Sequence, residues 1–128
     1  MKHLGTLLRI IAALILFQTL YFKFSGAPES QFIFSQLGVE PYGRWFAGVS
    51  ELIACVLLLL PSTQLLGALM AVGIMMGAIM SHLFILGVVV QEDGGLLFGL
   101  AIVVLICSLG VIYLQRSQLV RWIQFLRK

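Results

Sequence analysis

The sequence predicts an all-α integral membrane protein: an antiparallel four-helix bundle with short interfacial helices after the first span and at the C-terminus. Hydrophobic residues make up 61% of its 128 residues and charged residues only 10%, whereas charged residues make up about 25% of a typical soluble domain. The mean hydropathy is +1.10. Because one crossing takes about 20 apolar residues, residues 1–128 are interpreted as a single transmembrane domain with four spans.

Four apolar stretches, each bounded by turn residues, define these spans. They cover approximately residues 4–24, 43–60, 64–90 and 95–115. The breaks between them are Ser25-Gly26-Ala27-Pro28, Pro61-Ser62-Thr63 and Gln91-Glu92-Asp93-Gly94-Gly95. Each stretch is long enough to cross, and the short second one is expected to lie near the bilayer normal.

The first stretch has a second interpretation as a signal peptide, because Lys2 precedes the apolar run. The apolar part of a signal peptide spans only about 7–15 residues and ends at a small-residue cleavage site. This run is longer and continues through Tyr21-Phe22-Lys23-Phe24. We therefore expect it to be retained as a transmembrane helix.

Two connecting segments are predicted to be short helices at the membrane surface. The first begins at Pro28, with Glu29 in its first turn, and ends before Gly38. The second contains apolar residues at helical spacing among basic ones, which is typical of an amphipathic helix on an anionic leaflet. These apolar residues are Leu119, Trp122, Ile123 and Leu126. A basic tail that only fixes topology is the alternative for this second segment.

The distribution of basic residues predicts the orientation of the bundle. With four spans, both termini and the turn near residue 61 share one side of the membrane. That side carries Lys2, Arg9, Arg116, Arg121, Arg127 and Lys128, and the opposite side carries Lys23 and Arg44. By the positive-inside rule, both termini are cytoplasmic. The formal net charge of +3 therefore reports topology, and no nucleic-acid binding is predicted.

Polar side chains inside the apolar stretches mark the candidate site. Gln18, Glu51 and His82 each lie roughly 10–15 Å inside the outer ends of their spans, and Lys23 lies just above them. An ionisable group in hydrocarbon is costly unless it is paired or faces a wet cavity. We therefore predict a ligand-binding pocket in the outer half, built by Gln18, Lys23, Glu51 and His82, in which Glu51 and His82 pair or share a bridge. The alternative is a packing lock that only holds the helices together.

A second pattern in the third span concerns helix packing. Gly73, Gly77 and Ser81 recur every four residues, which is typical of a face that another helix approaches closely. The same span is rich in methionine. Flexible core filling explains these methionines better than Cu(I) binding does, so no metal site is predicted.

Three segments carry a family resemblance. They are residues 37–51, the run Leu57-Leu58-Leu59-Leu60-Pro61, and Ala78-Ile79-Met80-Ser81-His82-Leu83. Together with residues 18–24, Pro28-Glu29-Ser30 and Asp93-Gly94-Gly95, they resemble the DoxX and DoxX-like family of small four-helix membrane proteins over nearly the whole chain. The most specific positions of the resemblance are Glu51, Ser81 and His82.

The resemblance implies a protein of a bacterial cytoplasmic (inner) membrane that is accessory to membrane redox chemistry. The family takes its name from a membrane subunit of a thiosulfate:quinone oxidoreductase, so the expected ligand of the pocket is quinone-like or another small polar-headed molecule. Other relatives are linked to redox homeostasis or to assembly of membrane proteins. The alternative is therefore a non-enzymatic assembly or interaction subunit, whose Gly73 face docks a membrane-protein partner or a second copy. The sequence contains no complete catalytic motif, which favours a non-enzymatic role.

Overall fold

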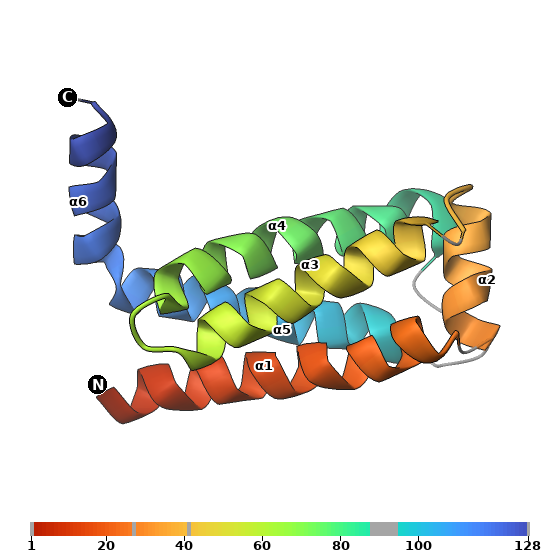
Figure 1. Cartoon of the computed structure of the whole chain (residues 1–128), viewed down its shortest axis with the longest axis horizontal. Coiled ribbons are helices and arrows are strands. Elements are labelled where there is room, and N and C mark those ends of the chain that lie inside the picture. The colour runs from red at the N-terminus through yellow and green to blue at the C-terminus, as the bar shows by residue number, and fades with distance from the viewer. Residues whose placement is uncertain (1, 27, 41, 88–94, 128) are drawn as a thin grey trace.

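The computed structural model describes residues 2–26, 28–40, 42–87 and 95–127, apart from the side chains of Lys2 and Glu29. Its long helices are α1 (Lys2–Ser25), α3 (Tyr42–Leu59), α4 (Gln64–Ser81) and α5 (Leu96–Leu114), and they run side by side (Figure 1). A π-helical turn, η1 (His82–Leu86), continues α4. The shorter helices are α2 (Pro28–Gln36) and α6 (Arg116–Leu126). The predicted all-α membrane helical bundle is confirmed.

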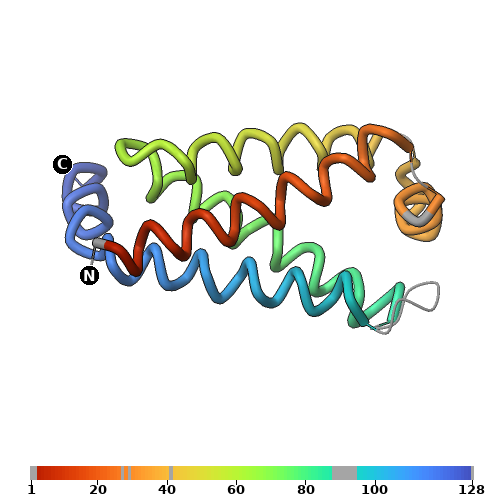
Figure 2. Tube along the Cα trace, turned by 90° about the horizontal axis from the view of Figure 1, so that it is seen from below, coloured from red at the N-terminus to blue at the C-terminus, as the bar shows by residue number. Residues whose placement is uncertain are grey.

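The long helices form a closed ring in which neighbours are antiparallel. Helix α1 packs against α3 and α5, and α4 packs against the same two helices from the other side (Figure 2). Short connections require this order, because a helix that follows a tight turn lies beside the one before it. Both chain ends therefore lie at the same end of the bundle (Figure 1).

The four long helices have the length and apolar composition that a membrane crossing needs. The candidate spans are His3–Ser25, Tyr42–Leu59, Gln64–Leu86 and Leu96–Leu114. The helix of the third span ends earlier than predicted, because Gly87 leaves the helical conformation with a φ of +82°. Residues 88–90 of that prediction, and residues 91–94 of the predicted turn, lie outside the described residues.

The two short helices lie crosswise to the bundle at its opposite ends. Helix α2 covers the end away from the termini, and α6 crosses the end at which both termini lie (Figures 1 and 2). None of the residues described in α6 is buried. A helix that lies across the ends of the spans, with exposed apolar and basic side chains, has the geometry that an interfacial helix requires.

Small and branched apolar side chains fill the centre of the bundle. Ala12, Ala54, Ala68, Ala71 and Val104 are completely buried. Large apolar side chains cover the outside instead, among them Leu14, Phe17, Val56, Met76 and Ile106. An apolar exterior around a small-residue interior is the arrangement of helices packed in lipid, where close backbone approach replaces a hydrophobic driving force.

Helices α1 and α3 cap each other with arginine side chains. Arg9 Nη1 near the start of α1 donates to the carbonyl oxygen of Leu58, at 3.0 Å, in the last turn of α3. Arg44 Nη1 near the start of α3 donates to the carbonyl oxygen of Lys23, in the last turn of α1. The last carbonyl groups of a helix have no partner inside the helix, and a cation near them is also favoured by the helix dipole. These two contacts fix the relative height of the helices.

Candidate functional site

A cavity of about 630 Å³ lies between the long helices at the end that α2 covers. The pair formed by α1 and α3 spreads away from the pair formed by α4 and α5 toward this end (Figure 2). The cavity volume is within the range of small-molecule sites, about 300–1,000 Å³. All four predicted ligand residues line it, Gln18 and Lys23 from α1, Glu51 from α3 and His82 from η1. The rest of the wall is mostly apolar.

Glu51 is buried and holds two partners on α1. Its Oε1 lies 3.1 Å from Lys23 Nζ, and the side chains of Lys23 and Glu51 are only 16% and 6% exposed. The Thr19 hydroxyl lies 3.0 Å from Glu51 Oε2 and 2.8 Å from the carbonyl oxygen of Leu16, so its one proton is shared between two acceptors. The ion pair neutralises both charges inside the apolar wall, as buried ionisable groups require.

His82 has different partners. Its Nδ1 lies 3.0 Å from the carbonyl oxygen of Gly87, and its ring meets the Phe98 ring edge to face, with 5.6 Å between the centroids. His82 is 5% exposed and begins the π-helical turn. Such turns are rare and occur often at functional sites.

No hydrogen bond joins Glu51 to His82 within the described part of the chain, although both line the cavity. Direct pairing of these two residues is therefore not seen among the described residues, and a bridge between them by a ligand or water stays a prediction.

The small-residue pattern of the third span lies partly on this cavity and partly outside it. Gly77 and Ser81 line the cavity, and Ser81 Oγ donates to the carbonyl oxygen of Gly77 at 2.8 Å. A Cβ atom at Gly73 or Gly77 would meet no described atom within 4 Å. Close helix contact occurs instead at Gly67, where a Cβ atom would lie 2.6 Å from the backbone nitrogen of Leu58.

Three polar residues in this part of the bundle were not predicted from the sequence to belong to the site. Thr19 lies four residues before Lys23, so the two share one face of α1, and this spacing was the available signal. Ser30 is buried in α2 and lines the cavity. Arg44 is the third of these residues: the sequence marks it only as a basic residue, but it is buried, with 6% of its surface exposed.

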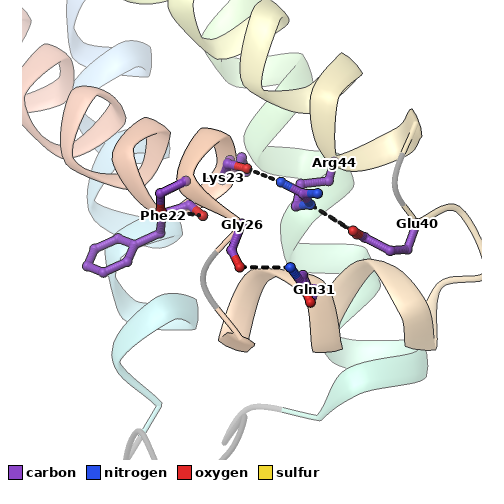
Figure 3. Close-up of polar contacts among 7 residues, drawn as sticks. Phe22, Lys23, Gly26, Gln31, Glu40 and Arg44 are labelled. Atoms are coloured by element: carbon purple, nitrogen blue, oxygen red, sulfur yellow. Dashed lines mark hydrogen bonds and ion pairs between the residues drawn. The ribbon is translucent and has the colours of Figure 1, made fainter.

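Arg44 links α3 to the loop before it and to the end of α1, at the end of the bundle that α2 covers (Figure 3). Its Nε lies 2.9 Å from Glu40 Oε1 and 3.1 Å from Oε2, and its Nη1 donates to the carbonyl oxygen of Lys23. Gln31 Nε2 of α2 donates to the carbonyl oxygen of Gly26 at 2.8 Å. Together these contacts tie α3, the loop before it, the end of α1 and α2 to one another, and Lys23 of this group also pairs with Glu51.

We expect Arg44→Met to lower the free energy of unfolding by about 1–2 kcal/mol, because a buried charged hydrogen bond is lost and the Lys23 carbonyl loses its cap. Arg44→Lys should rescue only part of the loss, since one ammonium group does not reproduce the planar fork of donors. Unfolding of the purified protein by SDS in mixed micelles measures the difference. Arg121→Met on exposed α6 is the control, and an equal effect of both variants would contradict the role of Arg44.

Among the residues that the structure describes, no group of three or more His, Cys, Asp or Glu side chains could hold a metal ion. Cys55 and Cys107 are both free and buried.

A bundle of apolar helices enclosing a cavity with a buried ion pair defines a small helical membrane protein with an internal polar site. The chain matches the DoxX-like family over residues 7–111, and it belongs to this family. The match extends across all four long helices and contains every residue of the predicted pocket. The resemblance seen in the sequence is thus confirmed. No curated protein and no solved structure matches the chain.

Proposed function

We propose that this chain is an accessory protein of a bacterial cytoplasmic membrane whose cavity binds a quinone-like or other small polar-headed ligand. The observation that carries the proposal is the shared wall of Lys23, Glu51 and His82 in one largely apolar cavity. Ligand sites are typically apolar hollows in which a few convergent polar groups fix the orientation of the ligand. The DoxX resemblance supports an association with membrane redox chemistry.

The chemistry of the wall suits a ring with oxygen substituents. Lys23 carries three N–H donors, of which one is directed to Glu51, so the others are free for a ligand oxygen. Apolar side chains such as Ile15, Leu100 and Val104 supply the surface for a ring or an isoprenoid tail. The ion pair has no net charge, so the site favours a neutral headgroup over an ion.

Native mass spectrometry of gently extracted protein tests the proposal. We expect a co-purifying molecule of lipid-like mass, and we expect Gln18→Leu to reduce its occupancy. Gln124→Leu on α6, which lies at the other end of the bundle, is the matched control and should retain the ligand. An empty cavity, combined with no binding of added decylubiquinone or decylubiquinol, would reject the proposal.

The proposed orientation places both termini in the cytoplasm and the cavity in the outer half of the bilayer. The uneven count of basic residues supports it. We expect a cytoplasm-active reporter fused after Lys128 to be active and a periplasm-active reporter at the same position to be silent. The opposite pattern would place the cavity in the inner half.

A second candidate function is docking of a membrane-protein partner or a second copy on the face of Gly73 and Gly77. It is favoured by the open space over these residues, which no described atom of the chain fills within 4 Å of a Cβ position. Under this function, extraction yields a co-purifying protein or a dimer, and the polar cluster serves as a packing lock. Native mass spectrometry distinguishes it from the first proposal by the mass of the bound species.

A further inference from the structure

The contact between His82 and Gly87 determines which ring nitrogen carries the proton. His82 Nδ1 lies 3.0 Å from the carbonyl oxygen of Gly87. A carbonyl oxygen only accepts hydrogen bonds, so Nδ1 must donate and therefore carries a proton. In a neutral imidazole the other nitrogen, Nε2, is then an acceptor with a free lone pair.

The backbone keeps this arrangement in place. The Gly87 amide donates to the carbonyl oxygen of His82 at 2.6 Å, so the two residues are tied by one backbone and one side-chain contact. The ring is also packed against Phe98. The opposite tautomer would set the lone pair of Nδ1 against the oxygen of Gly87, which is repulsive. Because Nδ1 is occupied and the imidazole lines the cavity, Nε2 is the ring nitrogen available to a ligand.

The cavity wall has two polar parts, which we call the Lys23 and Glu51 end and the His82 end. They differ in the hydrogen bonds that they can make to a ligand. The Lys23 and Glu51 end offers the two remaining N–H donors of Lys23, because only one of its three N–H groups is directed to Glu51. The His82 end offers an acceptor. A ligand that satisfies both ends has a hydroxyl group directed at His82 and a second oxygen that accepts from Lys23. A quinone satisfies only the Lys23 end, because its carbonyl oxygens have no proton to donate.

We infer that the cavity prefers the reduced, hydroquinone form of an aromatic ligand over the oxidised quinone, and that His82 determines this preference. The inference rests on the proposed function and adds the hydrogen-bonding class of the ligand to it. Leaving a polar group without a partner in a desolvated site costs more binding free energy than the missing hydrogen bond alone, because the group has also lost its water. We expect at least about tenfold tighter binding of the hydroquinone, which corresponds to the gain or loss of one such bond.

The test compares decylubiquinol and decylubiquinone, which share one tail and differ in the donors of the ring. The full-length protein in detergent micelles is equilibrated with each form under anaerobic conditions by dialysis, and empty micelles give the partition blank. The readout is the ratio of the two dissociation constants. We expect His82→Asn to bring this ratio close to one, because an amide offers a donor as well as an acceptor. His3→Asn is the matched control, because it makes the same chemical change near the start of α1, at a residue that does not line the cavity, and the ratio should not change.

Three outcomes are distinct. Tighter binding of the quinol, lost in His82→Asn and kept in His3→Asn, supports the inference. Equal or tighter binding of the quinone by the unmodified protein overturns the inference and leaves the proposed function standing. Binding of neither form above the blank overturns both.

A second measurement does not depend on the variant folding. Nitrogen-15 NMR of the histidine-labelled protein reports which ring nitrogen is protonated, and His3 is the only other histidine. We expect the signal of His82 to show protonated Nδ1 and unprotonated Nε2. The reverse pattern would overturn the inference even if the binding ratio favoured the quinol.

Discussion

Replacing Glu51 with leucine should lower the free energy of unfolding by about 3 kcal/mol, because Lys23 would lose its counter-ion inside an apolar wall. The side chains of Lys23 and Glu51 are 16% and 6% exposed, so water does little to compensate either charge. Thr19 would lose one of its two acceptors as well. Unfolding by SDS in mixed micelles measures the effect.

The companion variants separate the charge effect from the loss of packing. Lys23→Met alone should also destabilise the protein, because it leaves the buried carboxylate of Glu51 without a counter-ion. The double variant should be close to the unmodified protein, since replacing a whole buried pair with apolar groups is often neutral, whereas removing one partner is not. We expect a coupling energy of about 2 kcal/mol. Additive effects would show that the contact at 3.1 Å contributes nothing to stability.

A second double-mutant cycle, on Glu51 and His82, serves as the control for the Lys23 and Glu51 cycle. The two residues line the same cavity but bond to different partners, Glu51 to α1 and His82 to Gly87. In ligand-free protein, Glu51→Gln and His82→Asn should therefore be additive within about 0.5 kcal/mol. Coupling that appears only after ligand is added would indicate that the ligand bridges them.

The sequence indicated that Gln18, Glu51 and His82 lie at similar heights in the bundle, but it did not give the direction of each side chain. Counting at about 1.5 Å per residue gave this common height, and all three residues line one cavity. The rotation of α3 about its own axis decides that Glu51 faces Thr19 and Lys23, and this rotation depends on the packing of all four helices.

The contacts of His82 could not be predicted from the sequence, because they depend on where and how the helix ends. Val88, Val89 and Val90 continue the apolar run past Gly87, so composition alone extends the third span to residue 90. The described helix ends at Leu86, and its last turn is π-helical. No residue pattern in this sequence specifies a wider turn, yet the wider turn brings Gly87 back to the His82 ring.

The sequence indicated that α4 carries small residues for close helix packing, but it did not indicate which of them contact another helix of the chain. The spacing of Gly73, Gly77 and Ser81 indicated a small-residue face, but within the chain α4 turns Gly67, Ala68 and Ala71 toward the core. The missed signal is the tight turn at Pro61, which forces the first turn of α4 onto the last turn of α3. A glycine at that point allows the two backbones to meet.

Gly67→Ala should consequently destabilise the bundle by about 3 kcal/mol, the upper part of the usual overpacking range. The added Cβ atom would lie 2.6 Å from the nitrogen of Leu58 and 2.8 Å from the carbonyl carbon of Leu57. Backbone atoms cannot rotate out of the way, so α3 and α4 must separate along the seam below the cavity.

Gly73→Ala is the matched control, because it makes the same chemical change on the same helix where no described atom lies within 4 Å of the new Cβ. It should not destabilise, and the better helix propensity of alanine favours a small gain of about 0.5–1 kcal/mol. If Gly67→Ala leaves the free energy of unfolding unchanged, the close contact of α3 and α4 is contradicted. A loss at Gly73 equal to that at Gly67 would mean that another helix covers this face, and since no helix of the described chain does so, the covering helix would belong to a partner or a second copy.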